Sequence, residues 1–173
     1  MDKYRYTHPY MYKRRLTDEV IEMFDIGYDK DTDSITFPNR DIDGNCLFVA
    51  RRAVHTKWFN YPKDVEKPVY GLYEIKKACS PSNDIEVYLG DKLIQKFSPD
   101  TMVAFPDYII ICESMLDALT CWVYGKPAVA LNGLGTEAQI KMLREFPCRK
   151  YILALDMDSA GIRARGELKK ALN

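Results

Sequence analysis

Three short apolar runs alternate with segments of helical spacing in the last part of the chain. The runs are YIIIC at 108–112, PAVAL at 127–131 and YILAL at 151–155. An unbroken apolar run of this length is typical of a strand buried on both faces. Helical spacing follows each run, at 113–125, 136–146 and 156–172. This alternation predicts an α/β fold, in which right-handed crossovers build a parallel sheet flanked by helices.

A different pattern fills the first part of the chain. Segments 34–37 and 46–54 are short, apolar and bounded by Asp, Asn and Gly, which predicts antiparallel strands. A short helix is expected to begin at Thr17. Its inward face carries Val20, Ile21 and Phe24. Segment 67–78 predicts a turn that runs into a helix, so we expect residues 1–77 to form a small α+β subdomain.

Residues 78–107 separate these two patterns. The stretch DIEVYLGDKLIQKF at 84–97 predicts a hairpin that turns at Gly90 and Asp91. We therefore expect an α+β subdomain, then a hairpin-like insertion or linker at 78–107, then an α/β domain at 108–173. That last domain ends soon after its third strand, so it is expected to be short at its C-terminus.

Composition narrows the class of protein. The net charge is zero and 47% of the residues are apolar, which is typical of a globular protein and not of one that binds nucleic acid by bulk charge. The five cysteines form no CxxC pair and there are only two histidines, so we expect neither disulfides nor zinc. No apolar run approaches the length of about 18 residues that spans a membrane. With a polar N-terminus, this predicts a cytoplasmic protein that does not contact membranes.

The first fifteen residues interleave basic residues with tyrosines. The basic residues are Lys3, Arg5, Lys13, Arg14 and Arg15, and the tyrosines are Tyr4, Tyr6, Tyr10 and Tyr12. Two interpretations remain open. The segment is a solvated tail, or it is a strip on which tyrosines stack on bases and cations contact phosphates.

Acidic residues follow two of the predicted parallel strands. Glu113 follows the first strand, and Asp156 and Asp158 follow the third. The carboxyl ends of parallel strands meet at one edge of a sheet, and residues two apart in extended backbone point the same way. Three such carboxylates suit Mg²⁺ or Mn²⁺, which stabilises the charge that develops in phosphoryl transfer. The alternative for each acid is a helix cap, where negative charge is also favourable.

Three further residues near these strand ends have two interpretations each. Asp117 lies four residues after Glu113, on the same helical face, and is a candidate catalytic residue or an exposed acid. Gly133 and Gly135 follow the second strand. They either let the backbone approach a phosphate or serve only a tight turn.

These motifs carry a family resemblance. The stretches CESMLDALTCWVYG, ALNGLGT and LALDMDSAG resemble the TOPRIM signature, which has a glutamate after the first strand, a glycine turn after the second and DxD after the third. The resemblance implies a TOPRIM-like sheet with Glu113, Asp156 and Asp158 as metal ligands. DnaG-type primases, topoisomerases and several nucleases share this fold, so the signature alone does not choose among them.

The upstream half narrows the choice. The stretches ITFPNRDIDGNCLFVARRAV, KWFNYP and KPVYGLYE resemble the N-terminal subdomain of the RNA polymerase core of DnaG-type primases. This resemblance implies that Arg52 and Lys57 line a groove for nucleotide and template. An arginine offers phosphate a rigid fork and a lysine offers a point charge, although both are equally surface cations on a hairpin. The resemblance covers residues 11–77 and 108–173, and it implies a core without zinc-binding and helicase-binding domains.

The leading hypothesis is therefore a primase-like nucleotidyltransferase that depends on Mg²⁺ or Mn²⁺. Its expected partners are single-stranded DNA or RNA, nucleoside triphosphates and replication proteins, and its product is an RNA primer. One alternative is a small TOPRIM nuclease or RNA-processing phosphodiesterase, in which water replaces the 3′-hydroxyl and Glu113 acts as the acid–base group. Another is a non-catalytic nucleic-acid-binding remnant.

Overall fold

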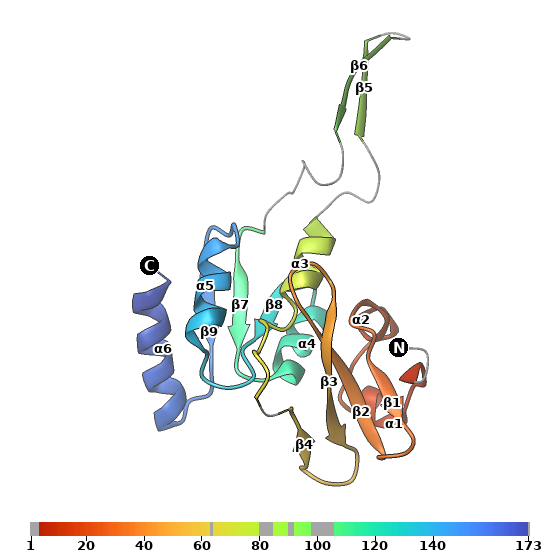
Figure 1. Cartoon of the computed structure of the whole chain (residues 1–173), viewed down its shortest axis with the longest axis vertical. Coiled ribbons are helices and arrows are strands. Elements are labelled where there is room, and N and C mark those ends of the chain that lie inside the picture. Colours follow the sequence, from red (N-terminus) through yellow and green to blue (C-terminus); the bar gives the residue numbers. More distant parts are fainter. Residues whose placement is uncertain (1–3, 63, 80–84, 90–91, 98–105, 173) are drawn as a thin grey trace.

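The computed structural model describes residues 4–62, 64–79, 85–89, 92–97 and 106–172. It contains a four-stranded antiparallel sheet and a three-stranded parallel sheet, which lie side by side (Figure 1). A separate two-stranded antiparallel sheet joins β5 (Ile85–Leu89) and β6 (Lys92–Phe97), which confirms the strands of the predicted hairpin. Its predicted turn at Gly90 and Asp91 lies outside the described residues.

The four-stranded sheet has the order β1-β2-β3-β4, with every neighbouring pair antiparallel. Its strands are β1 (Gly27–Asp29), β2 (Ser34–Arg40), β3 (Cys46–Ala53) and β4 (Phe59–Asn60). The pairing of β2 with β3 confirms the antiparallel strands expected from the sequence. Strand β2 runs three residues further than its apolar stretch, because its last residues pair with β3 through an irregular register between Asn39 and Arg40.

Two short helices, α1 (Pro9–Lys13) and α2 (Asp18–Met23), pack against this sheet. The hydroxyl of Thr17 caps α2, and its apolar face is buried as predicted. Helix α1 is capped by His8, and its Met11 side chain is only 1% exposed. The interpretation of this segment as a solvated tail is therefore wrong, because a buried apolar side chain anchors it to the core. We call α1, α2 and the four-stranded sheet the antiparallel unit.

The three-stranded sheet has the order β8-β7-β9 and is parallel throughout, which confirms the predicted α/β fold. Its strands are β7 (Ile109–Cys112), β8 (Ala128–Ala130) and β9 (Tyr151–Ala154). The helices that follow them are α4 (Met115–Val123), α5 (Glu137–Glu145) and α6 (Ser159–Ala171). Thr136 caps α5 through a reciprocal capping box with Gln139. Together with α3 (Leu72–Cys79), these elements form the parallel unit.

One prediction for this sheet is wrong. The run at 151–155 was expected to be buried on both faces, but the side chains of β9 alternate between half-buried and exposed. Strand β9 is at the edge of the sheet, and Ile152 is 40% exposed. Tyr151 and Leu153 pack toward the helices, whereas the antiparallel unit covers the opposite face only as far as β7 and β8.

The parallel sheet separates two hydrophobic clusters. On one face Ile110 and Cys112 pack, together with α4, against the antiparallel unit. On the other face Ile109 and Ile111 pack against α3, α5 and α6. In Figure 1, α4 accordingly lies between the sheet and the antiparallel unit, and α5 and α6 lie on the far side. The residues of β8 that face the antiparallel unit are alanines, whose small side chains allow the two units to approach closely.

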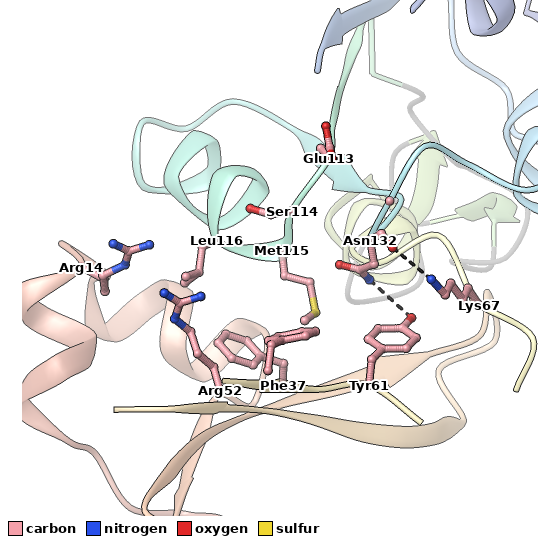
Figure 2. Close-up of a pocket in the computed structure, with 12 residues that line it drawn as sticks. Arg14, Phe37, Arg52, Tyr61, Lys67, Glu113, Ser114, Met115, Leu116 and Asn132 are labelled. Carbon is pink, nitrogen blue, oxygen red and sulfur yellow. Dashed lines mark hydrogen bonds between the residues drawn. The ribbon is translucent and has the colours of Figure 1, made fainter. Parts of the chain in front are cut away.

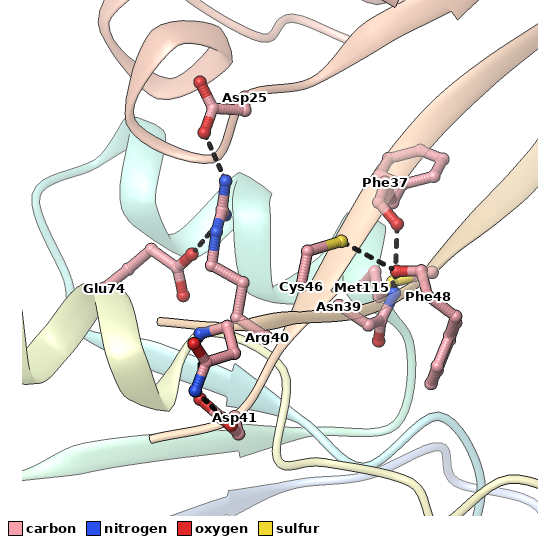
Figure 3. A network of polar contacts seen from close by, with 10 residues as sticks. Asp25, Phe37, Asn39, Arg40, Asp41, Cys46, Phe48, Glu74 and Met115 are labelled. Carbon is pink, nitrogen blue, oxygen red and sulfur yellow. Dashed lines mark hydrogen bonds and ion pairs between the residues drawn. The ribbon is translucent and has the colours of Figure 1, made fainter. Parts of the chain in front are cut away.

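An arginine whose side chain is only 9% exposed links the two units (Figure 3). Arg40 at the end of β2 donates from Nη1 to Oε1 of Glu74 in α3 at 2.9 Å, and it also pairs with Asp25 after α2. The Glu74 side chain is 3% exposed, and burial raises its pKa despite the neighbouring guanidinium. A buried carboxylate of this kind depends on its cation, so Arg40 fixes how the antiparallel unit sits on α3.

Two properties concern the chain more widely. All five cysteines are free thiols. Each helix among the described residues is too short or too polar to cross a lipid bilayer.

Candidate active site

A cavity of about 360 Å³ lies where the two units meet (Figure 2). The antiparallel unit and the segment after it contribute Arg14, Phe37, Arg52, Phe59, Tyr61 and Lys67. The parallel unit contributes Glu113, Ser114, Met115, Leu116, Asn132 and Gly133. One wall therefore carries cations and aromatic rings, and the other carries a carboxylate, the start of α4 and the turn after β8.

Two cations are held in place on the first wall. The Nε of Arg52, on β3, donates to the Tyr10 hydroxyl at 3.0 Å, which leaves its two terminal nitrogens for a ligand. The Nζ of Lys67 donates to the backbone oxygen of Asn132 at 3.1 Å and lies 5.0 Å from the centre of the Tyr61 ring. Neither cation forms an ion pair with any residue that the structure describes. Both charges are therefore available to an anionic ligand.

A tyrosine and two asparagines connect the walls of the cavity. The Asn132 amide donates to the Tyr61 hydroxyl, and that hydroxyl donates to the buried Asn39 amide oxygen, both at 3.4 Å. Burial raises the pKa of Tyr61 to about 12, although the bond from Asn132 opposes this shift. Tyr61 is therefore an uncharged hydrogen-bonding group at neutral pH and not a base.

Glu113 supplies the carboxylate of the second wall. It follows β7, and the amide of Gly133 donates to its backbone oxygen at 3.3 Å, which ties the two strand ends together. Its Oε2 atom is buried and has no hydrogen-bond partner. A buried carboxylate oxygen is costly without a donor or a cation, so this atom suits a ligand that brings one. Its chemistry fits a hard divalent metal ion.

The two aspartates of the DxD motif lie at the neighbouring strand end. Cys112 pairs with Ala154, so Glu113 and the loop after β9 are at the same edge of the sheet. Asp156 is exposed there, whereas the Oδ1 of Asp158 accepts from the amide of Gly161 at 2.7 Å and caps α6. Within the described residues, no three Asp, Glu, His or Cys side chains come together to hold a metal ion. The carboxylate triad therefore stays a prediction.

The other residues that were predicted for the site do not lie together around the cavity. Asp117 is exposed beside the cavity and accepts from the Ser114 hydroxyl at 2.6 Å. Lys57 is exposed in the loop between β3 and β4, and it does not line the cavity. Gly133 lines the cavity with open space around it, but a side chain at Gly135 would meet Leu131 at 3.1 Å. Gly135 thus has a packing role, and only Gly133 is positioned to approach a ligand.

The cavity also contains residues that were not predicted as site residues. These are Arg14, Tyr61, Lys67 and Asn132. Tyr61 and Lys67 lie within the stretches KWFNYP and KPVYGLYE, and Asn132 opens the glycine turn. The sequence therefore did indicate these three residues, because each lies in a stretch on which the family resemblance rests. The sequence could not show that they contact one another, because Tyr61 and Lys67 are separated from Asn132 by 71 and 65 residues.

Part of the chain resembles a known protein family in sequence. Residues 110–173 match the family described as Toprim-like, which covers the chain from β7 onward. No curated protein is matched by the sequence at a significant level. The family match includes Glu113 and both aspartates, whereas the cationic wall lies outside it.

Solved structures resemble nearly the whole chain. The DnaG catalytic core is 20% identical with a TM-score of 0.66, covering 92% of this chain and 57% of that one. A DnaG primase catalytic domain bound to single-stranded DNA is 21% identical with a TM-score of 0.65, covering 91% and 56%. The Aquifex aeolicus primase, with its zinc-binding and RNA polymerase domains, is 19% identical with a TM-score of 0.66, covering 95% and 46%.

The chain thus spans about half the length of these primase structures. Their similarity extends over both units, and it includes the arrangement of the antiparallel sheet beside the parallel one. Residues 110–173 therefore match the Toprim-like family, and the chain as a whole has the fold of a DnaG-type primase catalytic core.

Proposed function

We propose that this chain is the catalytic part of a primase-like nucleotidyltransferase, which joins ribonucleotides on a single-stranded DNA template. The observation that carries the proposal is the cavity between the units, which Arg52, Lys67 and Glu113 all line. A cavity that is lined by a carboxylate and two uncompensated cations suits a ligand that carries both phosphate and a divalent metal ion. The likeness to a primase domain bound to single-stranded DNA supports the same substrate class.

The proposed reaction forms one phosphodiester bond. A 3′-hydroxyl attacks the α-phosphate of a nucleoside triphosphate, the bond to the β-phosphate breaks, and pyrophosphate leaves. Arg52 would hold phosphate oxygens through its two terminal nitrogens, and Lys67 would add a point charge. Such transfer depends mainly on positioning and on electrostatic stabilisation of the oxygens that gain charge.

Aromatic residues on the same wall would hold the base. Phe59 is 39% exposed and lines the cavity. Its ring stacks against the ring of Tyr61, with 6.1 Å between the ring centres. Stacking on an aromatic ring tolerates any base, which suits an enzyme that copies a varying template. The base would thus lie against Phe59, with its phosphates toward Arg52 and Lys67.

A divalent metal ion belongs to this proposal. Glu113 would hold Mg²⁺ or Mn²⁺ through its buried Oε2, with Asp156 and Asp158 at the adjacent strand end and Asp117 nearby. Bound there, the ion would neutralise phosphate charge. Mg²⁺ at about 100 times its dissociation constant stabilises a folded protein by about 2.7 kcal/mol. The thermal midpoint of the wild type should therefore rise with Mg²⁺, and that of Glu113→Gln should not.

Primer synthesis tests the proposal directly. The protein would be incubated with single-stranded DNA, labelled ribonucleotides and Mn²⁺, and the products separated on a sequencing gel. We expect template-dependent oligoribonucleotides from the wild type and from the surface control Lys169→Ala, and none from Asp156→Ala or Lys67→Met. Metal-dependent shortening of the DNA would instead assign the chain to the nucleases. The absence of both products would contradict the proposal.

A further inference from the structure

A fully buried glutamine makes three side-chain hydrogen bonds near the cavity. Gln139 on α5 is 0% exposed and does not itself line the cavity. Its Nε2 donates to the backbone oxygens of Pro68 at 2.9 Å and of Leu131 at 3.0 Å, and its Oε1 accepts from the Thr136 amide at 3.0 Å. Both N–H groups of the side-chain amide are therefore used, and its oxygen is bonded as well. Glutamine is mostly an exposed residue, so such complete burial calls for a reason.

The capping box at the start of α5 accounts for only one of these bonds. Such a box needs the Oε1 of Gln139 and the hydroxyl of Thr136, which accepts from the Gln139 amide at 3.2 Å. It does not need the two bonds from Nε2. Those bonds reach Pro68, 71 residues away in sequence, and Leu131, directly after β8. They join the segment before α3 to the turn after β8.

The same two segments begin a short antiparallel ladder that the sequence then interrupts. Tyr70 and Ala130 face each other and exchange both backbone bonds, at 3.0 and 2.9 Å. The next pair of this kind is two residues further along each segment, at Pro68 and Asn132. Proline has no N–H to donate, and Asn132 has a φ of 52°, which leaves the extended conformation. The backbone therefore cannot continue the ladder in the ordinary way.

Side chains bond both carbonyl oxygens of the interrupted pair. Gln139 donates to the Pro68 oxygen, and the Nζ of Lys67 donates to the Asn132 oxygen at 3.1 Å (Figure 2). Lys67 and Asn132 line the cavity, and each is next in sequence to a residue that Gln139 bonds. Gln139 thus fixes the backbone on either side of the bond between Lys67 and Asn132.

We propose that Gln139 is a positioning residue, which holds Lys67 and Asn132 in place to contact a nucleotide in the cavity. This inference rests on the proposed function, since it takes the ligand to be a nucleoside triphosphate. Replacing Gln139 with an apolar residue would leave two buried carbonyl oxygens without these donors. The two segments would then separate, and a small displacement of Lys67 is enough to weaken its contact with phosphate.

Binding of ATP with Mg²⁺ tests this role. Isothermal titration calorimetry would compare the wild type with Gln139→Met, which keeps the length of the side chain and removes its amide. Thr136→Ala is the matched control, because it weakens the same helix start but keeps all three side-chain bonds of Gln139. Gln139→Asn, whose amide is one methylene shorter, replaces Gln139→Met if that variant does not fold. Lys67→Met is combined with Gln139→Met in a double-mutant cycle.

We expect Gln139→Met to bind ATP about tenfold more weakly, the scale of one lost hydrogen bond to a charged group. Thr136→Ala should bind like the wild type at temperatures at which both variants are folded. In the Lys67→Met background, Gln139→Met should weaken binding by less than about threefold, because most of its effect passes through Lys67. Wild-type affinity in Gln139→Met, an equal loss in Thr136→Ala, or full additivity with Lys67→Met would each overturn the proposal.

Amide hydrogen exchange separates this proposal from the proposed function. The Ala130 amide donates to the Tyr70 oxygen, in the ladder next to the bonds from Gln139. We expect it to exchange about tenfold faster in Gln139→Met than in Thr136→Ala. If the wild type binds no ATP, the proposed function fails, and equal exchange in the two variants would then overturn the positioning role as well. If the wild type and Gln139→Met bind ATP equally, the proposed function stands and the positioning role fails.

Discussion

The antiparallel and parallel units contribute opposite charges to the cavity that they share. Arg52 and Tyr61 come from the antiparallel sheet or its margin, and Glu113 and Asn132 follow strands of the parallel sheet. Only residues 110–173, within the parallel unit, match a family by sequence, whereas the likeness in fold extends over both units. A recognisable motif thus identifies one wall of this site, whereas on the other wall the sequence indicated Arg52 but not Tyr61 or Lys67.

Removing one charge from each wall should have the largest effect. We expect Lys67→Met and Glu113→Gln each to lower ribonucleotide incorporation by a factor on the order of 10²–10³, the usual cost of losing one electrostatic contact to a transition state. Incorporation would be measured at saturating template, with Lys169→Met as the control. A large loss in Glu113→Gln with little in Lys67→Met would show that the parallel unit alone carries the chemistry.

Breaking the ion pair between Arg40 and Glu74, which links the two units, should have the next largest effect. Arg40→Met leaves Glu74 buried without its cation, which should cost about 3 kcal/mol of unfolding free energy. Urea unfolding would measure this loss. Lys76→Met is the matched control, because Lys76 pairs with Asp43 at an exposed position and should cost no more than about 1 kcal/mol. Similar losses in both variants would mean that burial of Glu74 is not what makes the link important.

Two glycines of α6 differ in the space around them, and replacing each with alanine should have a smaller effect on stability. A methyl group at Gly161 would lie 2.2 Å from the backbone oxygen of Asp156, whereas one at Gly166 would meet nothing within 4 Å. Gly161→Ala should therefore displace the DxD loop and cost about 2 kcal/mol. Gly166→Ala should stabilise the helix by up to about 1 kcal/mol. Thermal unfolding would measure both, and equal effects would contradict the close contact.

Each unit has a helix that is capped by a threonine, and removing either cap should cost less stability than the changes above. Thr136→Ala removes a reciprocal capping box from α5 and should cost about 1 kcal/mol. Thr17→Ala removes a single longer bond of 3.5 Å from α2, so we expect about half of that loss. Chemical denaturation of the two variants measures both costs. A larger loss at Thr17 would indicate that α2 depends on its cap more than on its buried face.

The smallest expected effect is a pH dependence in the antiparallel unit. Burial alone would raise the pKa of Asp29, but the Arg51 guanidinium and the amide of Asp31 outweigh it and lower the pKa below its ordinary value. This carboxylate therefore stabilises the fold above about pH 4, and the contribution is lost as the pH falls further. The stability difference between wild type and Asp29→Asn should shrink below pH 4. A constant difference would exclude this linkage.

Local patterns determined most of the elements. Apolar runs and helical spacing predicted β7, β8, β9 and the helices after them, and Thr17 and Thr136 predicted two helix starts. These predictions succeed because backbone periodicity and capping depend on residues close together in sequence. The same patterns also predicted β9, but they did not reveal its exposed face or the helix α1. An apolar run does not reveal whether its strand lies at an edge, and one buried methionine is too weak a signal to separate a folded segment from a tail.

The sequence by itself therefore determined the parallel sheet, the edge at which Glu113 lies and the Toprim-like motif. Only the tertiary structure decided that Lys67 and Tyr61 line the cavity together with Glu113, and that Lys57 does not. The physical reason is that these neighbours meet through the packing of two units, and packing between distant segments leaves no periodic trace in the sequence.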